Sequence, residues 1–375
     1  MIFLIIALAI ALFYMAIQFQ YIFYWKLIKP VIVPFDFDPS TGVSVIVVAR
    51  NEADTVLSCL QGILSQSYPG HLVEILVIDD HSTDETINKV LTLRDESIQL
   101  LRLQHYPEYI FTPAYKKSAI TLGVEKARHE MILVTDADCI HSKDWIRSVV
   151  YAFEQSNSRF QTAPVLLLPG RSLLEQMQEL EMLVYALVTG AGIQSRWHDM
   201  ANGANMAFTK KAFQSVKGFE GNYQYASGDD MFLVEKMRTA FPDHIHFAKS
   251  TAAAVLTKGK TSWSDLLKQR LRWASKNKGL ANQHISMIWT FIGIFHFSML
   301  LFLILAVFHL TTWMPFLVLI SFKWVADYFV IQQAAAFFNR MSVLRNFILL
   351  QFLFTWYIIR LTVYMLFDKQ VDWKR

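Results

Sequence analysis

Apolar residues are concentrated at the two ends of the chain. Residues 1–25 contain no Asp, Glu, Lys or Arg, and residues 286–367 contain few. A helix needs about 20 apolar residues to cross a bilayer. The N-terminal stretch therefore predicts one membrane-spanning helix, and the C-terminal stretch predicts three, at about 286–309, 313–336 and 345–367.

The basic residues beside these stretches predict their orientation. Lys26 and Lys29 follow the first stretch, and Arg340 and Arg345 lie between the last two. Because Lys and Arg are enriched on the cytoplasmic side of membranes, we expect an uncleaved anchor with its N-terminus outside and residues 30–280 in the cytoplasm. The basic C-terminal tail would then lie outside, against the same rule. A C-terminal segment that is interfacial or re-entrant is therefore an alternative.

Two charged residues interrupt one of the predicted spans. Lys323 and Asp327 are four residues apart, so they share one face of a helix. Ionisable residues inside a membrane often mark a functional site. A pair with this spacing can equally well neutralise itself, and the sequence leaves both interpretations open.

The middle of the chain alternates between apolar runs and helical patterns. Residues 43–49, 73–78 and 131–135 are continuous apolar runs rich in β-branched residues, which is typical of buried parallel strands. Helical patterns follow the first run at about 52–65 and precede the third at 116–127. Alternation of strand and helix predicts an α/β fold with a mostly parallel sheet that is covered on both faces.

Polar residues follow three of these strands directly. They are Ala49-Arg50-Asn51-Glu52, Asp79-Asp80 and Asp136-Ala137-Asp138. Any one set could simply cap the next helix, and Ser82 and Glu85 have the spacing of a capping box. Functional groups in parallel sheets gather at the carboxyl ends of the strands, so three polar sets on one edge predict a binding site. The region lacks the glycine motifs of dinucleotide and P-loop sites.

Composition narrows the class of protein. Of 375 residues, 54% are hydrophobic and 18% are charged, where about a quarter is usual for soluble proteins. A purely soluble protein is therefore excluded, and the charged middle excludes an all-membrane transporter. The net charge of +4 is too small to indicate a nucleic-acid partner. The two cysteines, Cys59 and Cys139, are too few for the framework of a disulfide-rich secreted domain.

Asp136 and Asp138 place two carboxylates at one strand end. They would repel a nucleotide diphosphate unless a divalent cation bridged the two, and carboxylate oxygens favour Mg²⁺ or Mn²⁺. Such a cation would stabilise the charge on a departing diphosphate. Lys116 and Lys117 precede a helix at another connection, where they either counter phosphate charge or are solvated.

Further acidic residues are candidates for substrate contacts. Asp79 and Asp80 could accept hydrogen bonds from a base or ribose, or cap a helix. The small residues at 201–207 would let a ligand approach the backbone closely. Asp229 and Asp230 follow a glycine, and either could act as a general base, since burial and an adjacent like charge raise a carboxyl pKa.

Residues 257–278 carry seven Lys or Arg and one acid, interleaved with Trp and Leu. This pattern predicts a basic amphipathic helix that lies on the anionic inner surface of the membrane. Gln269, Arg272 and Trp273 share one face of that helix. Docking on a membrane explains the lysines better than it explains Gln269.

Together these segments resemble the inverting family-2 glycosyltransferases that have a GT-A fold and membrane anchors. Six motifs of that family occur in order over residues 43–273, as VSVIVVARNE, VIDDHSTDET, YKKSAITLG, VTDADC, SGDDMF and QRLRW. The resemblance implies a GT-A domain with a Rossmann-like, mostly parallel sheet and a dependence on Mg²⁺ or Mn²⁺. It also implies a nucleotide-diphosphate sugar as donor, first of all a UDP-sugar.

The resemblance also implies roles for single residues. The nucleotide would be bound by Ala49, Arg50, Glu52, Asp79, Asp80, Lys116 and Asp136. The metal would be held by Asp138 and Asp136, and the acceptor and diphosphate would lie near Gln269, Arg272 and Trp273. Asp230 would deprotonate the acceptor hydroxyl. Because Asp229 stands where many members have Glu, the choice of base between Asp229 and Asp230 stays open.

The predicted organisation is an anchor at 1–29, a GT-A domain at 40–256, an interfacial helix at 257–284 and C-terminal membrane helices at 285–375. We expect a multi-pass protein of the cell membrane with a cytoplasmic catalytic domain, similar in architecture to ceramide glucosyltransferases. The predicted acceptor is a membrane lipid or lipid-linked glycan, with no nucleic-acid partner. A processive polysaccharide synthase with the same catalytic site is the alternative, and a catalytically inactive membrane scaffold is a third possibility.

Overall fold

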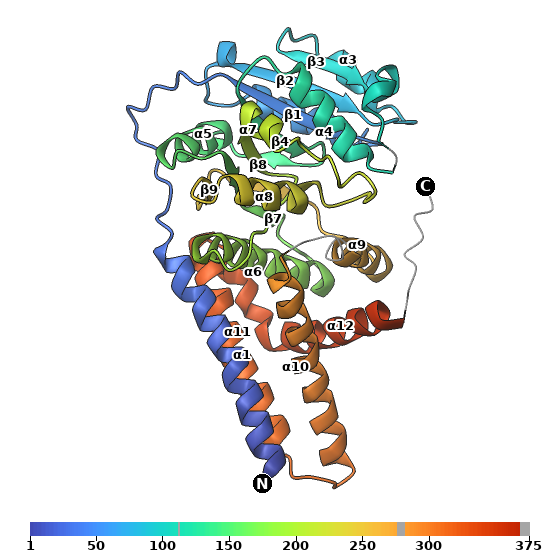
Figure 1. The fold of residues 1–375 in the computed structure, drawn as a ribbon. Coiled ribbons are helices and arrows are strands. Elements are labelled where there is room, and N and C mark those ends of the chain that lie inside the picture. The colour runs from blue at the N-terminus through green and yellow to red at the C-terminus, as the bar shows by residue number, and fades with distance from the viewer. Residues whose placement is uncertain (112, 276–281, 368–375) are drawn as a thin grey trace.

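The computed structural model describes residues 1–111, 113–275 and 282–367. The basic tail considered above therefore lies outside the described residues, as do Lys276 and Lys278. Figure 1 shows an α/β domain above a set of long helices, with α6 and α9 between the two.

The strands are β1 (Val43–Ala49), β2 (Val73–Asp79), β3 (Ile98–Arg102), β4 (Met131–Asp136), β5 (Ile140–His141), β6 (Phe160–Thr162), β7 (Val165–Leu167), β8 (Met206–Thr209), β9 (Ile245–Phe247) and β10 (Val255–Thr257). The helices of the α/β domain are α2 (Val56–Leu64), α3 (Thr86–Thr92), α4 (Tyr115–Lys126), α5 (Trp145–Gln155), α7 (Lys210–Ser215) and α8 (Asp229–Ala240). The remaining helices are α1 (Ile2–Leu27), α6 (Leu173–Ser195), α9 (Trp263–Ser275), α10 (His284–Val307), α11 (Met314–Phe337) and α12 (Phe347–Phe367).

Seven strands form the main sheet in the order β3-β2-β1-β4-β8-β6-β9. The predicted mostly parallel sheet is confirmed: β3, β2, β1 and β4 are parallel, and β8 alone runs antiparallel to its neighbours. In the register of this sheet, Ala49 lies opposite Asp79 and Val48 lies opposite Asp136. The polar residues that follow the three strands therefore meet at one edge.

The predicted capping box at Ser82 and Glu85 is wrong. Helix α3 begins at Thr86, its N-cap residue Glu85 makes no capping hydrogen bond, and the Thr86 N–H donates to the Asp84 carboxylate at 3.0 Å. The Ser82 hydroxyl instead accepts a hydrogen bond from the Asn51 N–H at 3.0 Å, and the Thr86 hydroxyl accepts one from the Glu52 N–H at 2.8 Å. These side chains stabilise the loop after β1, because that loop leaves its own N–H groups without backbone partners.

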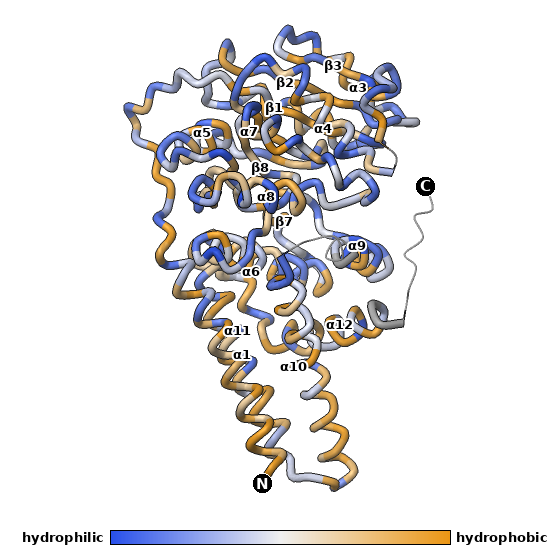
Figure 2. The backbone as a smooth tube through the Cα atoms, viewed as in Figure 1, coloured by the Kyte–Doolittle hydropathy of each residue, from blue (hydrophilic) through white to orange (hydrophobic). Residues whose placement is uncertain are grey.

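Among the residues that the structure describes, four segments are long and apolar enough to cross a membrane: α1, α10, α11 and residues 341–364, which include most of α12. Their apolar residues stand out in Figure 2. Helices α1, α10 and α11 run roughly alongside one another, whereas α12 lies across them beneath α6 and α9 (Figure 1). The exposed side of α12 is also apolar, with Ile348, Phe352 and Trp356 each about half exposed.

Helix α6 joins the α/β domain to the long helices. Its N-terminus carries a capping box, in which the Ser172 hydroxyl accepts from the Glu175 N–H and the Glu175 carboxylate accepts from the Ser172 N–H. Most of its 23 residues pack against α1, α11, β7 and β9. Lys249 adds a second link, because its buried ammonium donates to the carbonyls of Trp25 at 2.7 Å and Ile28 at 3.2 Å. The C-terminal end of α1 is thus fixed to the α/β domain.

Candidate active site

The ends of β1 and β2 form one side of the site. The Asp80 N–H donates to the Ala49 carbonyl at 2.8 Å, and the Arg50 guanidinium lies 3.6 Å from the Asp80 carboxylate. His81 is 2.9 Å from the same carboxylate. Asp79 is buried and its carboxylate accepts from the Ser82 N–H at 3.3 Å, so it holds the turn after β2. Asp80 is therefore the better placed of the two for a ligand.

Glu52 lies close to the aspartates that follow β4. Burial raises the pKa of the Glu52 carboxyl, a hydrogen bond from Thr55 lowers it, and the negative charges of Asp138 and Asp136 raise it further. A carboxylate responds in this way to like charges that are only a few ångströms away. The predicted residue Glu52 after β1 and the two aspartates at the end of β4 thus interact electrostatically as one acidic cluster, called the acidic pocket below.

Lys116 links the pocket to the acidic pair on α8. Its Nζ lies 2.6 Å from Asp136 Oδ1 and 3.5 Å from Asp229 Oδ2. Burial lowers the pKa of Lys116, but the carboxylates of Asp136, Asp229 and Asp230 outweigh that effect and raise it. The pKa of Asp136 is raised by burial, although Lys116 opposes the change. This lysine is thus held as a cation among three carboxylates.

Lys117 fits neither of the roles considered for it. Its side chain is buried, and Nζ donates to the carbonyls of Asn222, Tyr225 and Ser227 at 2.8, 2.7 and 3.0 Å. These carbonyls belong to the loop that leads into α8. Lys117 therefore fixes the loop that positions Asp229, and it is neither solvated nor directed at phosphate.

Asp138 is oriented by a residue that the sequence motifs do not include. The Thr257 hydroxyl, at the end of β10, donates to Asp138 Oδ2 at 2.9 Å. The part of the chain that the structure describes contains no group of three or more His, Cys, Asp or Glu residues suited to a metal ion. Asp136 and Asp138 nevertheless suit a cation such as Mg²⁺, which commonly takes one or two carboxylates and completes its shell with phosphate oxygens and water.

The acidic pair begins helix α8. Gly228 precedes the pair with a φ of 89°, a conformation that favours glycine. Asp230 is buried, and its carboxylate accepts from the Gly203 N–H at 3.3 Å and from the Met231 N–H at 2.8 Å. A Cβ atom at Gly203 would collide with the Asp229 carboxylate and lie 3.1 Å from Lys116 Nζ. The small residue at 203 thus makes room for Asp229 itself.

Tyr185 of α6 connects this acidic pair to the membrane side. Burial raises the pKa of the Tyr185 phenol, and the negative charge of Asp230 raises it further. Tyr185 also lines a cavity of about 130 Å³ that is enclosed mainly by α1, α6, α10, α11 and α12. Met231, the residue after Asp230, packs in one cluster with the cavity-lining residues Met200 and Ile285, and Tyr185 packs against this cluster, so the acidic pair adjoins the cavity.

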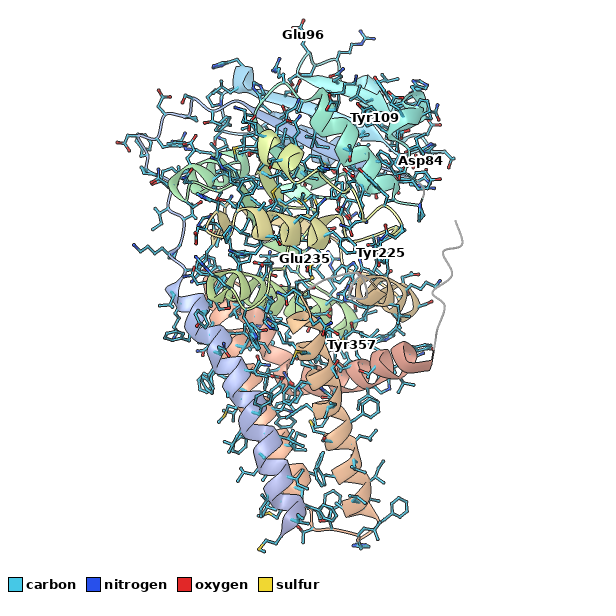
Figure 3. All side chains as sticks on the ribbon, in the orientation of Figure 1. Asp84, Glu96, Tyr109, Tyr225, Glu235 and Tyr357 are labelled. Atoms are coloured by element: carbon cyan, nitrogen blue, oxygen red, sulfur yellow. The ribbon has the colours of Figure 1, made fainter. Side chains whose placement is uncertain are left out.

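Helix α9 carries the QxxRW segment, and its most deeply placed cation is Arg270. The Arg270 guanidinium lies 2.5 Å from Glu181 of α6, and it donates to Gln269 Oε1 at 2.6 Å. It also lies 4.2 Å from the Trp273 ring centroid, while Arg272 is exposed. Sequence analysis did not single out Arg270 or Glu181. Figure 3 marks Tyr357 of α12, whose hydroxyl donates to the same glutamate at 3.3 Å.

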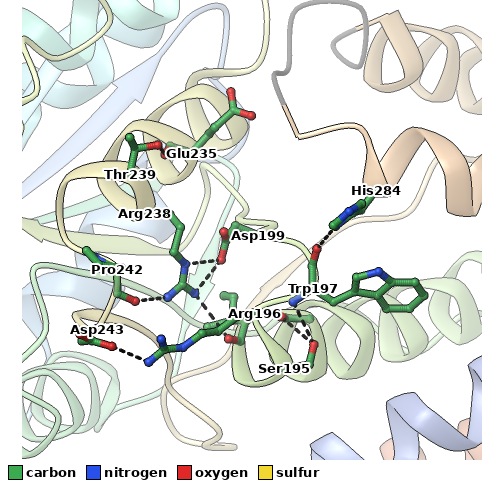
Figure 4. A network of polar contacts seen from close by, with 12 residues as sticks. Ser195, Arg196, Trp197, Asp199, Glu235, Arg238, Thr239, Pro242, Asp243 and His284 are labelled. Atoms are coloured by element: carbon green, nitrogen blue, oxygen red, sulfur yellow. Dashed lines mark hydrogen bonds and ion pairs between the residues drawn. The ribbon is translucent and has the colours of Figure 1, made fainter.

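A second polar network secures the junction of α6, α8 and α10 (Figure 4). The Arg238 guanidinium lies 2.7 Å from Asp199, and Arg196 lies 2.5 Å from Asp243. His284, at the start of α10, is 2.6 Å from the Trp197 carbonyl. These contacts hold the segment after α6 against α8 and α10, so they support the frame around Asp230.

Two family models match this chain. The model of glycosyl transferase family 2 matches residues 44–165, which hold the edge of the sheet described above. The model of glycosyl transferase family 21 matches residues 108–375, which is more than half of the chain.

Curated relatives match shorter parts. Glycosyltransferase AglE of Haloferax volcanii is 29% identical over 107 residues, or 28% of this chain and 33% of that protein. A beta-monoglucosyldiacylglycerol synthase of Synechocystis is 25% identical over 240 residues, or 63% of this chain and 48% of that protein. The chain thus covers less than two thirds of the length of these relatives.

A solved structure matches nearly the whole chain. The mannosyltransferase PcManGT from Pyrobaculum calidifontis, in complex with GDP-Man and Mn²⁺, covers 97% of this chain and 100% of its own, with a TM-score of 0.56 and 19% identity. At this identity the likeness shows a common fold, which agrees with the predicted GT-A architecture. The family matches go further, and they show that the chain is a glycosyltransferase that belongs to glycosyl transferase family 21.

Proposed function

We propose that this enzyme moves one sugar from a nucleotide-diphosphate sugar, first of all a UDP-sugar, to a hydroxyl group of a membrane lipid or lipid-linked glycan. One observation carries the proposal: Asp230 lies between two different environments. On one side is the polar edge of the sheet, reached through Lys116 and Asp136. On the other side is Tyr185, which lines the cavity among the membrane helices.

The donor occupies the edge of the sheet in this proposal. Ala49, Arg50, Glu52, Asp79 and Asp80 surround the base and ribose, with Asp79 acting through the turn that it holds. Lys116 turns from Asp136 towards the diphosphate, because phosphate charge competes with the carboxylates for its ammonium. Asp138, together with Asp136, would hold Mg²⁺ or Mn²⁺, whose positive charge would offset the negative charge of the donor.

The acceptor hydroxyl is activated by Asp230. Lys116 lies within ion-pair distance of Asp229, whereas Asp230 adjoins Gly203 and Tyr185 on the acceptor side. A carboxylate here takes the hydroxyl proton as the oxygen attacks the anomeric carbon from the face opposite the nucleotide. This single displacement inverts the anomeric configuration. Asp229 then serves to hold Lys116 in place.

The QxxRW segment closes the site from the membrane side. Trp273 and Arg270 lie close to Tyr185, and Gln269 is held by Arg270. In the proposal, Trp273 contacts the acceptor, and Gln269 and Arg272 lie near the diphosphate. A basic side chain there stabilises the leaving group.

The membrane arrangement follows from the same geometry. We place α1, α10 and α11 across the bilayer with the catalytic domain in the cytoplasm, and α12 along the inner surface. This multi-pass arrangement keeps the basic residues Lys26, Lys29, Arg340 and Arg345 inside, as the charge rule requires. Single transfer is proposed over processive synthesis, because three helices across the bilayer are few for a polysaccharide channel.

A donor and acceptor screen tests the proposal. The purified full-length enzyme is incubated with a panel of labelled nucleotide sugars and membrane lipid extracts, with Mg²⁺, with Mn²⁺ or with chelator. We expect one labelled lipid product that carries one sugar, and none with chelator. A ladder of longer products would favour the polysaccharide synthase. If no donor gave a labelled product, the proposed reaction would be wrong, and the scaffold interpretation would gain support.

A further inference from the structure

The cavity beneath the active site has an apolar body and a polar deep end. Tyr185 and Met200 line it near Asp230, whereas His296, Asp327 and Gln351 line it at the level of the membrane helices. Its volume of about 130 Å³ is some ten times what a single water needs. The space therefore suits part of a hydrocarbon chain rather than one solvent molecule.

Most polar groups at the deep end bond to one another. The Lys323 ammonium lies 2.7 Å from Asp327 and also donates to the side-chain carbonyl of Gln351. The Tyr14 hydroxyl donates to Asp327 Oδ1 at 2.5 Å. The pair at 323 and 327 thus neutralises itself, as one of the two sequence interpretations has it. This network joins α1, α11 and α12 around the cavity.

His296 differs from these neighbours. Its Nδ1 donates to the Ile292 carbonyl of its own helix at 2.8 Å, so in the neutral ring Nε2 is an acceptor. The side chain is 1% exposed, and Nε2 has no hydrogen-bond partner among the residues that the structure describes. A buried acceptor without a partner is unfavourable, and an ionisable residue at this depth points to a function. The matching ligand group is a hydrogen-bond donor.

The distance between the two ends of the cavity can be worked out along α10. Ile285, near the start of this helix, packs with Met231, the residue that follows Asp230. His296 lies eleven residues further along the same helix. At a rise of 1.5 Å per residue, the deep end is about 17 Å from the level of the acidic pair.

We infer that the cavity holds the chain of the acceptor lipid, and that this chain carries a hydroxyl group about 17 Å from the hydroxyl that receives the sugar. The inference rests on the proposed function and names the class of acceptor: a lipid with a hydroxylated chain. The apolar lining receives the hydrocarbon, and the chain hydroxyl donates to His296 Nε2. Unsubstituted acyl or prenyl chains leave that nitrogen without a partner.

A series of synthetic acceptors tests the inference. Diacylglycerols of one chain length are prepared with a hydroxyl at successive positions along one acyl chain, and without it. Sugar transfer by the full-length enzyme in lipid nanodiscs gives kcat/KM for each. The variants are His296→Phe, which keeps a ring of similar size, and Ser298→Ala as the matched control. Ser298 lies on the same helix, but it is partly exposed, does not line the cavity, and its hydroxyl donates to the Ile294 carbonyl.

We expect kcat/KM to peak for a mid-chain hydroxyl, about tenfold above the unsubstituted lipid, as one buried hydrogen bond provides. The peak should disappear in His296→Phe and persist in Ser298→Ala, and transfer to the unsubstituted lipid should be unchanged in Ser298→Ala. Equal transfer along the whole series, or a peak that persists in His296→Phe, would overturn the inference and leave the proposed function intact. No transfer to any member, by an enzyme that also labels no membrane lipid extract, would overturn both.

Discussion

Lys116 and Lys117 are adjacent at the start of α4, but we expect Lys117 to stabilise the fold and Lys116 to support sugar transfer. Replacing each of them by methionine tests these two roles separately. Lys117 donates to three carbonyls of the loop before α8, so Lys117→Met leaves all three without this partner. At about 1 kcal/mol for each lost hydrogen bond, the variant should be destabilised by about 3 kcal/mol. For a chain of this size, that corresponds to a fall of about 4 °C in the midpoint of thermal unfolding.

Lys116→Met is the matched control. Lys116 is about one-third exposed and pairs with carboxylates at the site. Its loss should therefore lower the free energy of unfolding by only about 1 kcal/mol, with a correspondingly small fall in the midpoint. Sugar transfer should instead fall at least about a hundredfold, because no ammonium then meets the diphosphate. The midpoint is followed by intrinsic fluorescence in detergent, and transfer is followed with labelled donor. Equal midpoints for Lys117→Met and the wild type, or a larger loss for Lys116→Met, would refute this reasoning.

Three further substitutions test other parts of the site. Glu52→Gln should raise the unfolding midpoint at neutral pH. Because burial raises the pKa of Glu52, ionisation of this carboxyl opposes folding at pH values above its ordinary pKa of about 4.3. The difference in midpoint between the variant and the wild type should therefore vanish below that pH. Thr257→Val should lower transfer about tenfold and weaken metal-dependent nucleotide binding, because Asp138 loses the hydroxyl that orients it; unchanged affinity at every metal concentration would contradict this. Gly203→Ala should lower kcat at least about tenfold, since the new methyl displaces Asp229 from Lys116, and wild-type turnover would show that the Asp229 position is unimportant.

The sheet and its polar edge follow from local sequence. Apolar runs such as VSVIVVA are buried on both faces, and the register then places Asp79 and Asp136 at one edge whatever else the chain does. The membrane helices follow equally from unbroken apolar length. These features depend on neighbours in sequence or on the period of the pattern, so they could be predicted.

Roles that depend on distant partners could not be predicted. Lys117 and Lys116 are equivalent in sequence, and only the loop before α8 decides which one is buried. Arg270 was missed because its partner, Glu181, lies 89 residues away on another helix. Ser82 matches a capping box in sequence, yet its hydroxyl accepts a hydrogen bond from the Asn51 N–H in the loop after β1. In each case a tertiary contact overrides a local pattern.

The central claim is that Asp230 activates a lipid hydroxyl beside a donor that Asp138, Lys116 and the sheet edge bind independently. The most direct test compares Asp230→Asn with the wild type in two measurements, sugar transfer to lipid and metal-dependent nucleotide binding. The account predicts that transfer falls by about a thousandfold, as expected for loss of a general base, while nucleotide affinity stays the same. Transfer at the wild-type rate, or equal losses of transfer and binding, would contradict the account.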